Sequence, residues 1–197
     1  MPGALEGLRV IELSQAVSGP YCAKLFADYG ADVIKVEPPA GGDVARRWGP
    51  FPHDEPHPEK SGLFFFLNTN KRGVTLDVTT SRGRELLLQL VRQADVLIEN
   101  NPPRQMRQWG LDYATLSQAN PNLVMISITP YGQTGPYSDW VAYDLNAFHL
   151  TGASSRYCGR PNETPLEHGT FAADFFGATT AAAWGLAAVY GRRVAGG

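Results

Sequence analysis

The chain has 197 residues, of which 43% are hydrophobic and 18% are charged, and its net charge is −2. This length and composition are typical of one globular domain with a sizeable core and argue against a disordered chain. The near-neutral charge balance, without a dense Lys/Arg block, argues against a nucleic-acid partner.

The two cysteines, Cys22 and Cys158, stand in contexts without metal-ligand spacing. We therefore expect no disulfide scaffold and no metal site, and we expect a reducing cytoplasm as the location. Residues 1–7 lack the basic start and the apolar stretch of a signal peptide. The run 171–190 has the length of a membrane span, but Asp174 and the many Ala and Gly residues favour a buried helix of a soluble protein.

The chain opens with alternating strand and helix patterns. An apolar run at 8–13 is followed by a helical pattern from Pro20 to Gly30, with Ser18 as its expected cap. A second apolar run at 31–36 follows at once. Strand, helix and strand within about thirty residues form a βαβ unit, which begins a parallel sheet.

The same alternation continues after a long Pro- and Gly-rich loop, which we expect over residues 39–62. Further strands are predicted at 74–78, 95–99 and 123–128, and further helices at 80–93, 106–111, 113–118 and 143–150. The pattern predicts an α/β fold: a doubly wound, mostly parallel, Rossmann-like sheet of about five to six strands with helices on both faces.

In this architecture the loops at the carboxyl ends of the strands bind the ligand. We expect these loops at residues 14–20, 68–72, 100–103 and 129–136. They carry glycines, asparagines and a helix start at Gly19-Pro20 that suits phosphate oxygens. None contains a G-x-G-x-x-G fingerprint or a P-loop, which argues against an ordinary NAD or ATP site.

A helix is predicted over about 171–193, with Asp174 in its first turn. Gly177 and Gly185 lack side chains, which would let neighbouring elements approach the helix closely. The positive end of the helix would favour the ionised form of Asp174, and a desolvated, ionised carboxylate is a nucleophile for an acyl group. The alternative is a capping role for Asp174. The two roles are compatible.

Several blocks in order resemble class III CoA-transferases, and the resemblance covers essentially the whole chain. The blocks are Leu5-Glu-Gly-Leu-Arg-Val-Ile-Glu-Leu, Gly19-Pro-Tyr-Cys, Gly30-Ala-Asp-Val-Ile-Lys-Val-Glu-Pro38, Gly42-Asp43, Leu67-Asn-Thr-Asn-Lys-Arg72, Ala94-Asp-Val-Leu-Ile-Glu-Asn100 and Tyr131-Gly-Gln-Thr-Gly-Pro136. The resemblance implies transfer of coenzyme A between an acyl-CoA and a carboxylic acid, with no permanently bound cofactor.

The resemblance also implies roles for particular residues. The aspartate that attacks the thioester and forms a covalent aspartyl intermediate matches Asp174. Positions that meet coenzyme A match Val17, Ser18, Leu67, Asn68, Thr69, Asn70 and Asn100. For the asparagines, turn geometry is the equally weighted alternative. Lys71 and Arg72 could meet phosphates, although exposed basic residues beside a turn are the commoner case.

Some positions depart from the family pattern. Pro38 stands where an Arg that contacts the nucleotide is often found, and Asn101 replaces an aromatic residue. A sister activity, racemisation of 2-methylacyl-CoA, needs a histidine where this chain has Tyr143, which disfavours a racemase. His149 and His168 are not at the matching position.

The family's proteins are about twice as long and contain a second domain. We expect residues 1–197 to form the N-terminal CoA-binding domain, as a fragment or as one piece of a split protein. The resemblance implies a homodimer in the full-length form, or a partner chain that supplies the missing half. Without that half, we expect activity to be incomplete, so a non-catalytic CoA-binding or partner-binding role is the rival hypothesis.

Overall fold

The computed structural model describes residues 3–152 and 171–195, together with residues 160, 162–164, 166 and 169. Cys158, His168 and most of the polar loop expected after residue 153 lie outside the described residues. Among the described residues, no helix combines the length and the apolar content needed to cross a membrane.

Five parallel strands form one sheet in the order β3-β2-β1-β4-β5 within the part of the chain that the structure describes. They are β1 (Arg9–Leu13), β2 (Asp32–Glu37), β3 (Arg72–Thr75), β4 (Val96–Glu99) and β5 (Val124–Ser127). Val10 of β1 lies opposite Val33 of β2 on one side and Val96 of β4 on the other. The strand order reverses between β1 and β4, so the predicted doubly wound α/β fold is confirmed.

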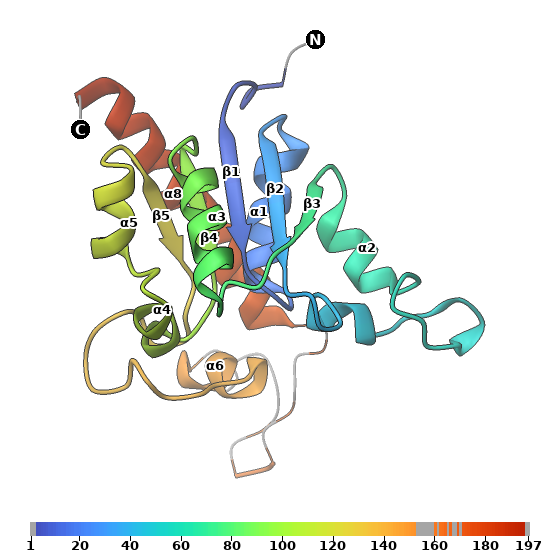
Figure 1. The fold of residues 1–197 in the computed structure, drawn as a ribbon. Helices are drawn as coiled ribbons and strands as arrows, with labels where there is room; N and C mark the ends of the chain where they lie inside the picture. Colours follow the sequence, from blue (N-terminus) through green and yellow to red (C-terminus); the bar gives the residue numbers. More distant parts are fainter. Residues whose placement is uncertain are drawn as a thin grey trace.

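Helices cover both faces of this sheet (Figure 1). They are α1 (Ser18–Asp28), α2 (Gly62–Asn68), α3 (Ser81–Val91), α4 (Pro103–Trp109), α5 (Tyr113–Ala119), α6 (Asp144–Leu150) and α8 (Ala172–Ala195), with 3-10 turns η1 (Val44–Arg47) and η2 (Pro52–Asp54). Helices α1 and α8 lie behind the sheet in Figure 1, and α3 and α5 lie in front of it. Helix α6 lies beyond the carboxyl ends of the strands.

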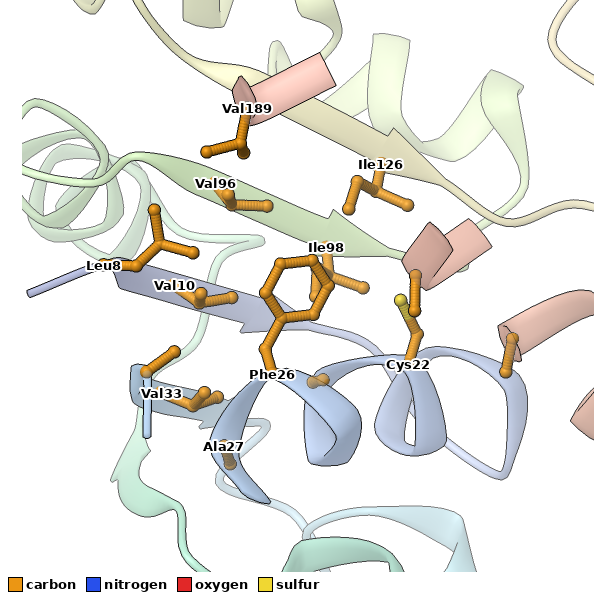
Figure 2. Packing of buried hydrophobic residues seen from close by; sticks show 14 residues of the cluster. Leu8, Val10, Cys22, Phe26, Ala27, Val33, Val96, Ile98, Ile126 and Val189 are labelled. Atoms are coloured by element: carbon orange, nitrogen blue, oxygen red, sulfur yellow. The ribbon is translucent and has the colours of Figure 1, made fainter. Parts of the chain in front are cut away.

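The strand side chains alternate between two hydrophobic cores. Val10 faces the first core, with Phe26 of α1 and Val189 of α8 (Figure 2). Ile11 faces the second, with Leu87 of α3. Burial of both faces explains why the strands read as nearly continuous apolar runs.

Helix α8 packs on the first core through small residues. Ala178 and Ala182 are buried there, and a Cβ on Gly185 would overlap Ile126 of β5. The predicted close approach is therefore confirmed for Gly185. It is wrong for Gly177, because nothing lies within 4 Å of a Cβ placed there.

Two predicted boundaries differ from the structure, and one apolar run for which no element was predicted forms a helix. The apolar run at 63–67 lies in helix α2, where Ser61 caps the helix by accepting from Phe64 N–H at 3.1 Å. Strand β3 begins at Arg72, before the predicted start at residue 74. Val17 occupies the N-cap of α1, and Ser18 is its first helical residue. Helix caps and strand pairing set these boundaries, and the apolar periodicity of the sequence reveals neither of them.

Candidate active site

The start of α8 is held by two aromatic contacts. Phe171, directly before α8, has a φ of 54°, and its ring stacks on Trp48 with the centroids 5.4 Å apart. Phe175 meets Tyr21 of α1 edge to face at 4.7 Å. A bulky residue with positive φ is strained and persists only where its surroundings hold it. These contacts fix the first turn of α8, and with it Asp174, against α1.

Asp174 is half-buried and meets the first residue of α1. Its carboxylate accepts hydrogen bonds from the side chain and the backbone N–H of Ser18. Its own backbone N–H donates to Asp144 Oδ1 at 3.1 Å. Helix α6, which carries Asp144, thus packs its first turn against the first turn of α8.

The pKa of Asp174 is raised above its ordinary value. Burial is the largest cause, and the charge of Asp144 adds to it, whereas the hydrogen bonds from Ser18 oppose the rise. The positive end of α8 was expected to favour the ionised form. The net shift is upward because burial and the charge of Asp144 exceed the effect of the Ser18 hydrogen bonds, and the effect of the helix end stays a prediction.

Asn100 ties the loop between β1 and α1 to the end of β4. Its Nδ2 donates to Gln15 O at 2.7 Å and to Ser18 Oγ at 3.2 Å, and its Oδ1 accepts from Gln15 N–H at 3.0 Å. A Cβ on Gly19 would overlap the Ser14 side chain, so this loop and α1 are in close contact. Ser18 therefore links two of the predicted site residues, Asn100 and Asp174. Val17 beside it is fully buried.

Beneath this loop lies a buried cluster of four charged side chains, Glu12, Lys35, Asp43 and Lys71. Lys35 Nζ lies 2.7 Å from Glu12 Oε1 and 2.7 Å from Asp43 Oδ2. Lys71 Nζ lies 2.7 Å from Glu12 Oε2. Asp43 Oδ1 accepts from the N–H of Ala16, a residue with a φ of 66°, at 3.0 Å. The buried charge cluster thus holds the loop in a conformation that it would not adopt by itself.

The predicted coenzyme A segment Leu67–Asn70 lies beside α1. Leu67 is buried, and Asn68 Oδ1 accepts from Lys71 Nζ at 2.9 Å. Thr69 Oγ1 accepts from Lys24 Nζ at 2.6 Å, and Asn70, with a φ of 63°, donates to Asp28 Oδ1 at 2.8 Å.

This segment precedes β3, so its expected place among the loops at the carboxyl ends of the strands is wrong. The structure brings Ser18, Asn100 and Asp174 together at that edge. It leaves residues 67–70 along the side of α1, and only Asn68 is joined to the first turn of α1, through Lys71.

The two basic residues after Asn70 have different surroundings. The Lys71 side chain is 2% exposed and ion-paired, which contradicts the expectation of an exposed residue. Arg72 is exposed, as expected, and binds Asp32 Oδ2 at 2.6 Å.

A pocket of about 230 Å³ opens at the switch point between β1 and β4. Ser14 and Gln15 line it from the loop after β1, and Asn101 lines it from the loop after β4. Pro38 also lines it. A larger pocket of about 790 Å³ lies along the outer edge of β5 and α5. Asp174 lines neither pocket. The smaller pocket adjoins the loop that holds Ser18 and is therefore the candidate ligand pocket.

Two parts of this site were missed by the sequence analysis: Asp144 and the buried charge cluster. Asp144 was placed only within the helix predicted at 143–150. The signal for the cluster was present, because Glu12 and Lys35 each interrupt an apolar strand. Charged residues at such positions are rarely buried unless they are paired. Among the described residues, no group of three or more His, Cys, Asp or Glu side chains could hold a metal ion.

The five-stranded parallel sheet with helices on both faces defines a doubly wound α/β protein, and comparison with known proteins identifies its family. The profile of CoA-transferase family III matches residues 5–197. The chain belongs to this family.

Individual relatives agree with this assignment. The chain is 42% identical over 174 residues to a succinate–glutarate CoA-transferase of Agrobacterium fabrum, covering 87% of this chain and 43% of the relative. It is 39% identical to the beta subunit of a succinyl-CoA–L-malate CoA-transferase of Chloroflexus aurantiacus, covering 84% of this chain and 40% of the relative. A crystal structure of a CaiB/BaiF family protein from Brucella suis superposes with a TM-score of 0.88 at 37% identity, covering 100% of this chain and 51% of that one. The chain thus spans about half the length of these relatives.

Proposed function

We propose that this chain supplies the nucleophile and part of the coenzyme A site of a CoA-transferase that acts through a covalent aspartyl intermediate. One observation carries the proposal: the half-buried Asp174 carboxylate meets Ser18 at the start of α1, next to the switch point of the sheet. Ligands of doubly wound folds bind at this place, and partial burial limits the water that would hydrolyse an acyl intermediate.

In the proposed reaction, an Asp174 carboxylate oxygen attacks the carbonyl carbon of the acyl-CoA, the C–S bond breaks, and coenzyme A leaves as the thiolate. The thiolate then attacks the Asp174 carbonyl of the mixed anhydride. This step releases the donor's carboxylate and leaves an aspartyl-CoA thioester. The acceptor carboxylate displaces the thiolate to form a second anhydride, and the thiolate attacks the acceptor's acyl carbon, which frees Asp174. No proton or electron is gained or lost overall.

Ser18 and Asn100 are proposed as coenzyme A residues because Ser18 lies beside Asp174 and Asn100 donates to Ser18 Oγ. Val17 shapes the same loop from its buried position. Residues 67–70 are proposed from the family resemblance and from their contact with α1. The name of the succinyl-CoA–L-malate relative favours succinyl-CoA as the donor, and both relatives' names favour a dicarboxylic acid as the acceptor.

We also propose that a further polypeptide, a second copy or another subunit, covers the outer face of α8. One relative is named as a subunit of a larger enzyme. On α8, Phe176, Trp184, Tyr190 and Val194 are between 68% and 74% exposed. Large exposed apolar side chains on one helix mark an interaction surface.

Trapping of the acyl intermediate tests the proposed function. The protein is incubated with succinyl-CoA and hydroxylamine, and peptides are analysed by mass spectrometry. We expect a hydroxamate on Asp174 that disappears in Asp174→Asn and persists in the control Asp139→Asn, which changes an exposed acid. If coenzyme A binds but no hydroxamate forms on Asp174, the rival role of a non-catalytic CoA-binding chain replaces the transferase assignment.

A further inference from the structure

Lys71 joins three elements that are far apart in the sequence. Its Nζ contacts Glu12 Oε2 of β1 at 2.7 Å, Pro20 O in the first turn of α1 at 2.8 Å, and Asn68 Oδ1 at the end of α2 at 2.9 Å. An ammonium group has three hydrogens to donate. All three have acceptors. One is the charged Glu12, and the other two lie in the two segments of the proposed coenzyme A site.

The ammonium is held in place by the balance of the buried charge cluster. Glu12 and Asp43 carry two negative charges, and Lys35 and Lys71 carry two positive charges, so the cluster is neutral when all four are ionised. The side chains of all four are at most 2% exposed. A buried charge without its partner is strongly unfavourable. Lys71 therefore cannot leave the cluster without a large cost.

The contacts of Lys71 with Pro20 and Asn68 are not needed to balance the cluster, because Glu12 already supplies its counter-charge. Their effect is to fix the distance between the first turn of α1, which carries Ser18, and the end of α2. We infer that Lys71 is a positioning residue of the proposed coenzyme A site, which holds the segment 17–18 and the segment 67–70 in register for one ligand. This inference rests on the proposed function.

Protonation of Lys71 follows from the groups around it. These groups are Glu12 on β1, Lys35 on β2, Asp43 before η1 and Cys22 on α1. Burial lowers the pKa of Lys71 to about 8, Glu12 opposes this and Lys35 adds to it. The pKa of Glu12 is about 2, because the two lysines outweigh burial, and burial raises the pKa of Cys22 to about 12. Between pH 7 and 9, Lys71 is thus the member of this set that changes charge. A neutral amine donates more weakly, so the affinity for coenzyme A should fall across this range.

The test separates positioning from folding with a charge-balanced variant. Lys71→Met alone leaves the buried cluster with one negative charge in excess, which destabilises the fold. Lys71→Met combined with Glu12→Gln restores neutrality. Arg72→Met is the matched control, since Arg72 is the exposed neighbour. Affinity for coenzyme A is measured by calorimetry at pH 7 and pH 9, and thermal unfolding is measured for each variant.

We expect the double variant to unfold close to the wild-type temperature but to bind coenzyme A about tenfold more weakly at pH 7, the loss of one or two hydrogen bonds. The wild type and Arg72→Met should lose affinity between pH 7 and 9 to a greater extent than the double variant. Ionisation of coenzyme A itself affects all of them equally. Wild-type affinity in a stably folded double variant would overturn the inference.

Amide hydrogen exchange gives a readout that does not need the ligand. In the wild type, protection at residues 14–18 and 67–70 should fall together as the pH passes about 8, after correction for intrinsic rates, and this coupling should vanish in the double variant. If the wild type binds no coenzyme A, the proposed function fails. The exchange data then still decide whether Lys71 couples the two segments, and uncoupled exchange in the wild type would refute that coupling.

Discussion

Asp174 takes its properties from neighbours on two other helices. Ser18 of α1 donates to its carboxylate, and Asp144 of α6 accepts from its backbone N–H. Asp144 Oδ2 is buried without a hydrogen-bond partner among the described residues. The bond from Asp174 N–H to Oδ1 keeps this second carboxyl group close to Asp174. Burial is the main cause of the raised pKa of Asp174, and the negative charge of Asp144 adds to it.

Asp144→Asn should lower the pKa of Asp174. The amide keeps an oxygen for the Asp174 N–H but removes the like charge, so ionised Asp174 is favoured. Carboxyl carbon NMR of aspartate-labelled protein measures this titration, with the Asp174 signal identified by its loss in Asp174→Asn.

In the wild type the midpoint should lie above 3.8. Asp139→Asn, which changes an exposed acid, should leave it unchanged. A midpoint that rises or stays fixed in Asp144→Asn would show that Asp144 does not control Asp174.

At the scale of elements, α8 joins the site to the core. Its first turn carries Asp174, and its middle packs on α1 and β5 through small residues. Gly185 and Gly177 have opposite surroundings on this one helix, since Gly185 adjoins Ile126 whereas Gly177 borders open space. The same substitution should therefore have opposite effects at the two positions.

Gly177→Ala should stabilise the protein by about 0.5–1 kcal/mol, because alanine restricts the unfolded chain and fits a helix interior. Gly185→Ala should destabilise it by about 1–3 kcal/mol, because the new methyl group forces Ile126 to move. Urea denaturation gives both free energies of unfolding. Changes of the same sign at both positions would contradict the packing described for α8.

At the scale of the whole molecule, the described residues leave the outer face of α8 exposed and place no further strand beside β5. The described chain spans about half of its relatives' length. A buried parallel sheet normally has both faces and both edges protected. The exposed aromatic residues of α8 are therefore expected to mediate association.

Trp184→Lys combined with Tyr190→Lys should weaken self-association of the chain, because the charges oppose burial of a face whose two aromatic side chains are 74% and 71% exposed. Sedimentation velocity over a range of protein concentrations measures this effect. Tyr29→Lys combined with Phe65→Lys is the control, since Tyr29 is exposed at the C-cap of α1 and Phe65 is exposed on α2. Equal sedimentation of the two double variants and the wild type would remove α8 as the contact face.

Apolar periodicity and the positions of Gly and Pro predicted the order of strands and helices along the chain. The βαβ opening, the parallel sheet and the position of α8 with Asp174 in its first turn all follow from patterns of apolar residues, Gly and Pro. The run 63–67 was not resolved by this reasoning, because a short apolar run fits a strand and a helix equally well. Its helix depends on the cap at Ser61.

The sequence by itself determined the fold class, the family and the candidate nucleophile, because these depend on local periodicity and on blocks of residues in order. Only the tertiary structure decided the environment of Asp174 and the burial of Lys71. Glu12, Lys35, Asp43 and Lys71 come from four separate stretches of the chain, and their mutual neutralisation depends on distances between them in space. The pKa of a buried group is a property of its surroundings, so spacing along the chain does not reveal it.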